Sequence, residues 1–507
     1  MDRRDFILAG AASLIGAMAD AQDRSGKLNF ETVGIDVDLR RDTGDLPHYW
    51  EKSIGSDRLA VAFREPWVAD MTRAHQLCGF QSVRCHGLFD DEMGICQGLG
   101  ASGPVTSFVY LDQVYDRLLE IGVKPFVELS FMPTALATSR NSVFWYRGNA
   151  SPPAKMTDWC QLIERLVRHL VERYGMDEVS QWRFECWNEP NLGFWAGTQA
   201  AYFELYRQTA LTLKRVDARL QVGGPATAQI MWIPQFLEYC KRHGAPVDFV
   251  STHLYADDAQ ENFFGQPNKY PFEEVLPRGI AQVNEQIQAA GFASTPLVIS
   301  EWSSQNPAFI AQTLRDCLGL ADTMSFWQVS SVFEEQGPPR SFATSVYGLF
   351  IQSGVPRASL YAFALLHQLG QRRLWSSAGP LLASARADGS TAMLAWNLIP
   401  RTVHNTGGDP LATFQAEVLT PGAAKRLEIN LSNVHASTAS LTLLDPAQVG
   451  AEAAYAALGQ PEYPSKEQIT ELKQRAALPA PRELAIRNSR VAIDLPPNAV
   501  ALLELPA

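Results

Sequence analysis

Residues 158–187 read DWCQLIERLVRHLVERYGMDEVSQWRFECW and contain one helix signal followed by one strand signal. Apolar residues recur at three- and four-residue intervals over 158–174, which predicts an amphipathic helix. The run over 181–187 is short, apolar and aromatic, as expected of a buried strand. The stretch is therefore one unit of an alternating pattern of helices and strands.

The same alternation extends on both sides of this stretch, to about residue 370. Further strands are predicted at 82–86, 124–129, 220–224, 247–254, 297–301 and 324–328, with an eighth near 47–50. Further helices are predicted at 67–77, 110–121, 199–216, 231–243, 272–290, 307–321 and 356–369. Eight such units over about 320 residues predict an α/β fold, a (β/α)8 TIM barrel with inserted loops. A doubly wound sheet lacks support, because no GxGxxG follows the first strand.

Beyond residue 370 the pattern changes to strands separated by turn residues. These strands are predicted at 384–387, 391–398, 413–419, 424–431, 438–444 and 491–505. They indicate an accessory C-terminal β-sandwich with a small helical insertion near 452–477, and the early strand 27–38 is expected to join it. The predicted organisation is an export signal over 1–21, an N-terminal strand segment over 22–44, the barrel over 45–370 and the sandwich over 371–507.

Composition and charge narrow the class of ligand. The 507 residues are 46% hydrophobic and 19% charged, which is typical of a folded protein of two or three domains. With 43 Lys and Arg against 54 Asp and Glu, the net charge is −11. Nucleic-acid binding draws most of its affinity from clustered basic residues, so a nucleic-acid partner is not expected. A neutral, polyhydroxylated or cationic ligand fits this charge better.

The first 21 residues read MDRRDFILAGAASLIGAMADA and are typical of a secretory signal. The apolar run 6–18 is shorter than the ~20 residues that span a bilayer, so we expect cleavage and no membrane span. Arg3-Arg4 resembles a bacterial twin-arginine signal, although Asp2 and Asp5 offset its charge. Such export would place the protein in the periplasm or outside the cell. An ordinary N-terminal helix is the alternative.

The seven cysteines are scattered without CxxC spacing, and their odd number cannot pair completely within one chain. Their spacing does not indicate a zinc site. We expect most of them to be small buried core residues, which is consistent with folding in a reducing compartment before export.

Two glutamates follow apolar strands at the barrel end where active sites form. Glu189 lies in WRFECWNEP (182–190) and Glu301 lies in LVISEW (297–302). A single strand-end glutamate is more often part of a structural ion pair. Strands four and seven face each other across a barrel mouth, however, and retaining glycoside hydrolysis needs two carboxyl groups about 5 to 5.5 Å apart. Nearby tryptophans suit the apolar faces of sugars, although plain barrel packing would also explain them.

Three further strand ends carry polar clusters: SVRCHGLFDD (82–91), STHLY (251–255) and FWQVSSVFEE (326–335). Arg84 and His86 share a strand face, as do His253 and Tyr255. A metal site at His86 and the acidic residues 90–92 has no His-rich spacing to support it, so solvated loop charge is the better interpretation. A lone histidine is usually structural, so His253 alone does not indicate a ligand site.

Longer strings resemble glycoside hydrolase family 39, the β-xylosidase and α-L-iduronidase family. The matching strings are HYWEKSIGS from 48, CGFQSVRCHGLFDDEMG from 78, PFVELSFMP from 125, FECWNEPNLGFW from 184, VGGPATA from 222, FVSTHLY from 249, ISEWSS from 299, and FWQVSSVFEEQGPP from 326. Their order runs through the whole barrel, and the resemblance extends over roughly 28–505. It implies a TIM barrel with a β-sandwich.

The resemblance also implies roles. Glu189 matches the general acid/base of the family and Glu301 its nucleophile, while Asn188 would donate to the sugar 2-hydroxyl. Arg84 would keep Glu301 ionised, and Glu189 would need a pKa raised by apolar neighbours and by the charge of Glu301. The positions that would line the terminal-sugar subsite are His86, Phe131, His253, Tyr255, Trp327 and Glu334.

The implied activity is that of a retaining exo-glycosidase, a β-D-xylosidase that releases xylose from xylo-oligosaccharides. An arabinoside, glucoside or iduronide is an alternative substrate, although no extra basic residue for an iduronide carboxylate stands out among the strand-end motifs. A non-catalytic carbohydrate-binding barrel and a metal-dependent hydrolase are two competing hypotheses. Two carboxyls and water suffice for the chemistry, so no cofactor or metal is expected, and the partner is a small oligosaccharide. The oligomeric state does not follow from the sequence.

Overall fold

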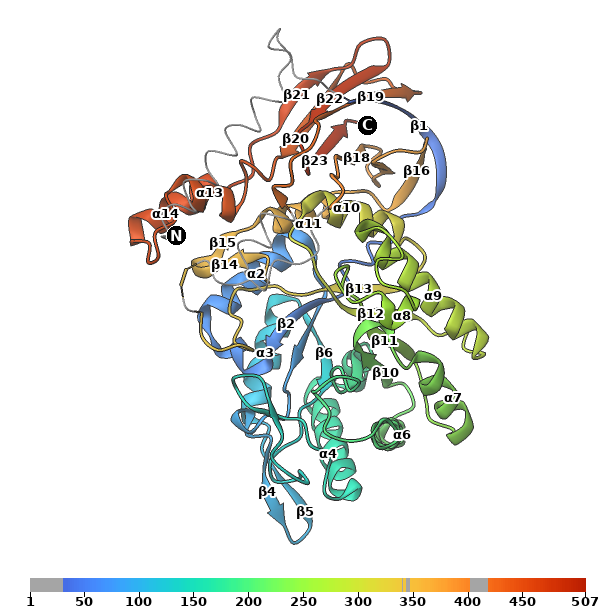
Figure 1. Ribbon diagram of the computed structural model, residues 1–507, viewed down its shortest axis with the longest axis vertical. Helices are drawn as coiled ribbons and strands as arrows, with labels where there is room; N and C mark the ends of the chain where they lie inside the picture. The colour runs from blue at the N-terminus through green and yellow to red at the C-terminus, as the bar shows by residue number, and fades with distance from the viewer. Residues whose placement is uncertain (1–30, 340, 343–346, 402–417) are drawn as a thin grey trace.

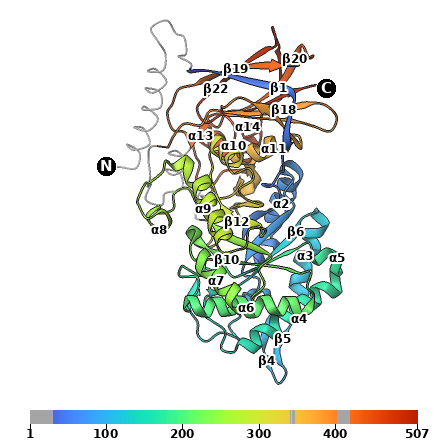
Figure 2. The ribbon, with the colours of Figure 1, turned by 90° about the vertical axis from the view of Figure 1, so that its right-hand side faces the viewer.

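A computed structural model describes residues 31–339, 341–342, 347–401 and 418–507 of the chain. The described chain forms a barrel with a separate sheet stacked on it, and the two parts remain distinct in perpendicular views (Figures 1 and 2). The predicted signal over 1–21 and most of the predicted strand 413–419 lie outside the described residues. None of the described helices combines the length and apolar character needed to cross a bilayer.

The barrel is closed by eight parallel strands, which confirms the predicted TIM barrel. In chain order these are β2 (Ile54–Arg58), β3 (Ser82–His86), β6 (Lys124–Leu129), β9 (Arg183–Cys186), β10 (Gln221–Thr227), β11 (Phe249–His253), β12 (Leu297–Trp302) and β13 (Thr323–Phe326). Phe126, Phe249 and Val298 pack together as a separate buried cluster. Gly223 is required beside them, because a Cβ there would lie 2.4 Å from the Phe249 carbonyl oxygen.

The predicted first strand near 47–50 is wrong. Residues 46–50 form coil and a turn, and β2 begins at Ile54. Periodicity missed β2 because its sequence, IGSDR, is mostly polar, although all five residues are buried. These polar groups have partners inside the protein: Ser56 Oγ accepts the Trp67 indole N–H at 2.8 Å, and the Asp57 N–H donates to Gln328 Oε1 at 2.9 Å.

Helices surround the barrel (Figures 1 and 2). The main ones are α2 (Glu65–Cys78), α3 (Val109–Ile121), α4 (Met156–Tyr174), α6 (Gln199–Val216), α7 (Ile233–His243), α9 (Val275–Ala289), α10 (Pro307–Asp316) and α11 (Ala358–His367). In α4 the buried residues recur at helical spacing, as the sequence predicted: Trp159, Leu162, Ile163, Leu166, Val167 and Leu170. α10 ends five residues before the predicted 321, in a turn that contains Gly319 with φ +79°.

Short elements occupy the connecting loops. They are η1 (Leu59–Phe63), η2 (Asp91–Met93), β4 (Cys96–Gly100), β5 (Gly103–Thr106), β7 (Ser142–Val143), β8 (Gly148–Asn149), α5 (Met176–Val179), η3 (Ala228–Ile230), α8 (Glu261–Phe264), η4 (Phe272–Glu274), β14 (Phe350–Ile351), η5 (Gln352–Gly354) and β15 (Val355–Pro356). Most of them lack a sequence periodicity of their own. All seven cysteines are free thiols, and all but Cys160 are buried.

The second domain is a nine-stranded sheet in the order β21-β20-β23-β18-β17-β16-β1-β19-β22. Its strands are β1 (Glu31–Asp45), β16 (Arg372–Ser376), β17 (Leu381–Ala385), β18 (Thr391–Trp396), β19 (Lys425–Ser432), β20 (Thr438–Leu444), β21 (Arg482–Ala485), β22 (Arg490–Leu495) and β23 (Val500–Leu505). One apolar cluster takes residues from both ends of this order, so the sheet folds over itself as a sandwich.

Several details of the sandwich differ from the sequence prediction. The single strand predicted over 491–505 is two strands, β22 and β23, separated by a turn at Pro496–Asn498. β16 and β21 were missed. The helical insertion consists of α13 (Ala451–Ala457) and α14 (Lys466–Arg475), and Ser465 caps α14 in a capping box with Gln468. Helices α10 and α11 contact strands β18, β20 and β23 and join the two domains.

β1 precedes the barrel in the chain but belongs to the sandwich. It pairs in parallel with β19, from Glu31 opposite Lys425 to Asp38 opposite Ser432, and antiparallel with β16. Ile35 and Val37 are fully buried in the sandwich core. The chain therefore enters the barrel from a strand that lies between two strands of its own C-terminal half, β16 and β19.

Candidate active site

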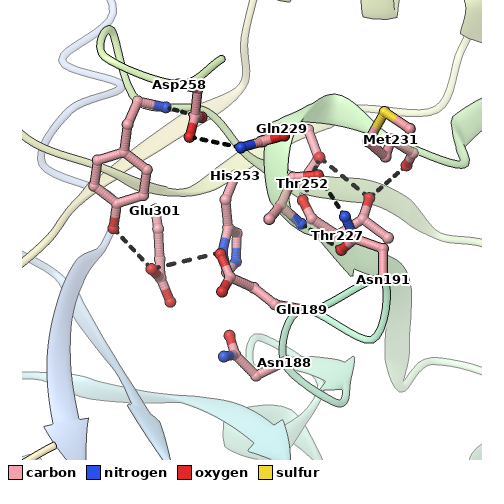
Figure 3. Close-up of polar contacts among 12 residues, drawn as sticks. Asn188, Glu189, Asn191, Thr227, Gln229, Met231, Thr252, His253, Asp258 and Glu301 are labelled. Atoms are coloured by element: carbon pink, nitrogen blue, oxygen red, sulfur yellow. Dashed lines mark hydrogen bonds and ion pairs between the residues drawn. The ribbon is translucent and has the colours of Figure 1, made fainter. Parts of the chain in front are cut away.

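Glu189 and Glu301 meet at the mouth of the barrel (Figure 3). Glu189 follows the fourth strand, β9, and Glu301 lies near the end of the seventh, β12. One carboxylate oxygen of each residue and a ring nitrogen of His253 all lie within 4.8 Å of one another. Strand positions far apart in sequence therefore produce a compact pair of carboxyl groups.

The backbone around Glu189 is held by hydrogen bonds to the neighbouring strand. The Glu189 N–H donates to the Ala226 carbonyl at 2.8 Å. The Asn191 amide bonds the backbone of Ala228 in both directions, donating to its oxygen at 3.0 Å and accepting from its N–H at 2.8 Å (Figure 3). These contacts fix a loop in which Glu189 itself has a left-handed backbone, with φ 43°. The carboxyl is thus directed by a rigid turn.

Burial shifts the pKa values of Glu189 and His253 in opposite directions. Burial raises the pKa of Glu189 to about 7, and the charge of Glu128 adds to that effect. Burial lowers the pKa of His253 to about 4, so this imidazole is neutral near pH 7. Its Nδ1 lies 2.9 Å from Glu189 Oε1 and 3.5 Å from Glu301 Oε2. We assign the single ring proton to Nδ1, because both neighbours are carboxyl oxygens.

Glu301 has a different environment, with a donor on each oxygen. Arg84 Nη1 donates to Oε1 at 2.7 Å, and the Tyr255 hydroxyl donates to Oε2 at 2.8 Å. Burial raises the pKa of Tyr255 well above its usual value, so the phenol keeps its proton. The arginine charge and the phenol both stabilise negative charge on Glu301. The site therefore pairs a carboxyl that holds a proton near neutral pH with a carboxylate stabilised by two donors.

Arg84 is fully buried beneath the pair, and sequence reasoning missed two of its partners. Its guanidinium contacts Glu185 at 2.6 Å, Glu128 at 2.8 Å and Asn188 Oδ1 at 3.0 Å. Burial alone would lower the pKa of Arg84, but the carboxylates around it raise this pKa by more than burial lowers it. The guanidinium therefore keeps its positive charge. Because Asn188 accepts this bond through its oxygen, its NH2 group remains available to donate to a ligand.

Aromatic residues form one wall around His86. The His86 ring lies 4.7 Å from Trp327 and 6.4 Å from Phe131 between ring centroids, and all three side chains are buried. Two further rings were not predicted: Phe144 stacks on His86 at 6.1 Å and on Phe194 at 4.8 Å. They lie in irregular segments, where no periodic signal indicates which way a side chain points.

His86 is also part of a charge network. Its Nδ1 lies 2.8 Å from Glu128, and its Nε2 lies 3.7 Å from Glu301 Oε1. Burial opposes protonation of His86, but the charge of Glu128 raises its pKa well above the usual range. His86 therefore carries a positive charge close to both Glu128 and Glu301.

The structure places Glu334 away from these groups and brings in Glu335. The Glu334 carboxylate is bound by Arg64 Nη2 at 2.8 Å and by Arg58 Nη2 at 2.9 Å. Glu335 Oε1 instead lies 3.4 Å from His86 Nε2, and burial raises the pKa of Glu335 to about 7. The sequence VFEEQ (332–336) contained both glutamates, and nothing in it distinguished their directions.

The carboxyl pair together with His253 has the donor set of a cation site. Within this set His253 Nδ1 bonds Glu189, and the Tyr255 hydroxyl bonds Glu301. Among the described residues a second such set, His48, Glu51 and His367, lies outside the barrel mouth.

The sequence compares closely with known glycosidases over almost its whole length. The pattern that describes glycosyl hydrolases family 39 matches residues 33–489. A β-xylosidase of Caldicellulosiruptor saccharolyticus is 33% identical over 483 residues, which are 91% of this chain and 95% of the relative. A β-xylosidase of Geobacillus stearothermophilus is 31% identical over 90% of this chain and 92% of the relative.

A solved structure agrees with these sequences. A family 39 β-xylosidase from Caulobacter crescentus superposes with a TM-score of 0.80 at 33% identity, covering 94% of this chain and all of that one. Barrel, sandwich and family pattern extend over the same residues as the carboxyl pair. The chain therefore belongs to glycosyl hydrolase family 39 and is a glycoside hydrolase.

Proposed function

We propose that this glycoside hydrolase is a retaining, exo-acting β-D-xylosidase that releases xylose from the non-reducing end of xylo-oligosaccharides. The observation that carries the proposal is the close approach of Glu189 and Glu301 within 4.8 Å together with their different environments. A short separation of this kind is typical of retaining enzymes, whereas inverting enzymes leave about 6.5 to 9.5 Å for a water. The names of the two bacterial relatives support xylose as the sugar.

The proposed reaction has two steps. Glu301 attacks the anomeric carbon while Glu189 donates its proton to the leaving oxygen, which breaks the glycosidic bond and forms a glycosyl–Glu301 ester. Glu189, now ionised, takes a proton from water, and the resulting hydroxide equivalent displaces Glu301 and releases the sugar. The pKa of Glu189, raised to about 7, supports its role as the proton donor near neutral pH.

The terminal sugar would lie between the carboxyl pair and the aromatic wall. We propose that it is contacted by Asn188, His86, Phe131, His253, Tyr255, Trp327 and Glu335, with Glu334 acting indirectly through Arg58 and Arg64. The Asn188 amide suits the 2-hydroxyl, because Arg84 orients it. A hydrogen bond there strengthens as the oxocarbenium-like transition state develops.

Three competing hypotheses determine which control experiments are needed. If the substrate is an arabinoside, glucoside or iduronide, the mechanism stays the same and only the sugar differs. A metal-dependent hydrolase would need the donor set around His253 to coordinate an ion. A purely carbohydrate-binding barrel is disfavoured, because Glu189 and Glu301 are both present.

The proposal includes a cellular setting. Arg3-Arg4 and the apolar run that follows support export through the twin-arginine route. The protein would then degrade xylan fragments in the periplasm or outside the cell.

The decisive experiment is hydrolysis of an aryl β-D-xyloside followed by proton NMR of the first-formed anomer. We expect β-xylose first, with slower or no hydrolysis of aryl β-D-glucoside, α-L-arabinoside and α-L-iduronide. Glu301→Gln should lower turnover by several orders of magnitude in a protein that melts at the wild-type temperature. Initial α-xylose would contradict retention, and near-normal turnover of a folded Glu301→Gln protein would exclude Glu301 as the nucleophile.

A further inference from the structure

A cavity lies where the first two barrel strands end. It measures about 730 Å³, a size typical of small-molecule sites. Its wall includes Arg58 at the end of β2, Asp90 after β3, and Trp145 and Tyr146 in the β7–β8 hairpin. We call it the rim cavity.

Buried polar groups without partners line the rim cavity. Asp90 is 6% exposed, and neither of its carboxyl oxygens has a hydrogen-bond partner among the described residues. Arg58 is 4% exposed, and its Nη1 lies 3.9 Å from Asp57 Oδ2 without a hydrogen bond in the described part of the chain. The Tyr146 hydroxyl oxygen is buried and likewise has no hydrogen bond there. Groups of this kind reduce stability when they stay unsatisfied, so three of them in one cavity point to a ligand that satisfies them.

The arrangement of these groups fits hydroxyls on an apolar ring. The protonated Asp90 carboxyl supplies an acceptor and a donor, while Arg58 Nη1 and the Tyr146 hydroxyl supply donors, so these groups can bond to alcohols. The Arg58 guanidinium lies 4.7 Å over the Tyr146 ring, and this contact restrains both groups. The Trp145 side chain is 53% exposed at the same cavity, where its indole offers a flat apolar surface.

The charges around the rim cavity nearly balance, which favours a neutral ligand over an anion. Four arginines line it together with Asp91 and Glu92, whereas burial raises the pKa of Asp90 well above its usual range, so this carboxyl does not count as a charge. The buried Glu334 carboxylate lies behind Arg58 and Arg64 and neutralises part of their charge. An anion placed among the arginines would also face Asp91 and Glu92, which line the same cavity.

We propose that the rim cavity is a second saccharide-binding site, which holds a neutral sugar unit other than the one that is cleaved. Two consecutive residues connect it to the catalytic pocket. Glu334 contacts Arg58 of the rim cavity, whereas Glu335 contacts His86 of the catalytic pocket. The backbone oxygen of Glu335 also accepts the backbone N–H of Trp145 at 2.7 Å. A saccharide in the rim cavity would therefore be separated from the reacting sugar by Glu334 and Glu335, and neither Glu189 nor Glu301 lines this cavity.

The test is calorimetric titration of xylotriose into the full-length Glu301→Gln protein, so that binding is measured without hydrolysis. We expect two saturable sites per chain. Trp145→Ala in the same background should weaken one site by about tenfold or more and leave the other unchanged. Tyr463→Ala is the matched control, because this residue is 75% exposed between α13 and α14 and does not line the rim cavity.

Asp90→Ala supplies a readout that a structural role would not give. Because the Asp90 carboxyl has no hydrogen-bond partner among the described residues, its removal should leave the melting temperature unchanged or higher, while the same binding event weakens. A single binding site in Glu301→Gln, or two sites unaffected by Trp145→Ala, overturns the proposal. If no glycoside is hydrolysed but the second site still binds xylotriose, the proposed activity fails and the rim cavity remains a binding site.

Discussion

The pKa of Glu189 leads to a quantitative prediction for the pH dependence of activity. Burial raises this pKa from the usual 4.5 to about 7, which corresponds to a penalty of roughly 3 kcal/mol on the ionised form. If Glu189 donates the proton to the leaving group, only the protonated enzyme is active. Activity must then be lost as the pH rises through about 7.

The size of the loss follows from the protonated fraction. About half of the molecules carry the proton at pH 7, about a tenth at pH 8 and about a hundredth at pH 9. For a xyloside with a poor leaving group, kcat/KM should therefore fall about tenfold per pH unit above pH 7. Glu189→Ala should abolish this alkaline limb and lower kcat/KM by roughly 10²- to 10⁴-fold for such a substrate. An activated aryl xyloside should lose far less.

The assay measures kcat/KM for one activated and one poor substrate from about pH 5 to about pH 9. Three other carboxyls, Glu335, Asp258 and Asp70, also have pKa values raised to about 7 by burial, and the first two supply the controls. Glu335→Gln and Asp258→Asn should keep the alkaline limb. A limb that persists in Glu189→Ala, or that disappears in either control, would refute the assignment, as would equal losses on both substrates.

Three further outcomes are expected. Tyr255→Phe removes a 2.8 Å bond to Glu301 and should lower kcat/KM by roughly ten- to a hundredfold without changing the melting temperature; an unchanged kcat/KM would contradict the role of the phenol. Arg84→Met leaves buried carboxylates uncompensated and should lower the free energy of unfolding by about 3–5 kcal/mol in denaturant titrations. Arg475→Met, which removes the exposed ion pair with Glu471, should lower the free energy of unfolding by at most about 0.5 kcal/mol. Equal losses in the two variants would show that burial of the Arg84 ion pairs makes no difference. Dialysis against EDTA should leave xyloside hydrolysis unchanged, whereas activity restored only by added metal would favour an ion at His253.

The barrel was predictable where helices and strands have clear periodicity. The strand predicted at 82–86 has the bounds of β3, and the helix predicted at 199–216 has those of α6. β2 was not predicted, because IGSDR carries polar side chains that find partners only in the folded barrel. The strand predicted at 491–505 extended through a turn because apolar residues continue on both sides of it.

The candidate site was predictable where position along a strand implies direction. Glu189 and Glu301 follow apolar strands, so both carboxyls were expected at the barrel mouth, and the structure brings them together there. Glu128 and Glu185 sit singly inside apolar strands, and their partner Arg84 is 101 residues from Glu185, so the sequence shows no pairing. In the irregular segment after β13, the choice between Glu334 and Glu335 depends on how the loop turns.

The position of β1 has a consequence for how the protein is made. β1 is synthesised first, yet its partner β16 lies 330 residues later, as the contact between Thr43 and Arg373 shows. At ribosomal rates of about 5–20 residues per second, β1 waits roughly 15–65 s for that partner. During this time Ile35 and Val37 have no sandwich core to enter. The first strand that the structure describes is therefore among the last to reach its final place, and until the partner strands emerge its apolar side chains are available to chaperones or to transient pairing.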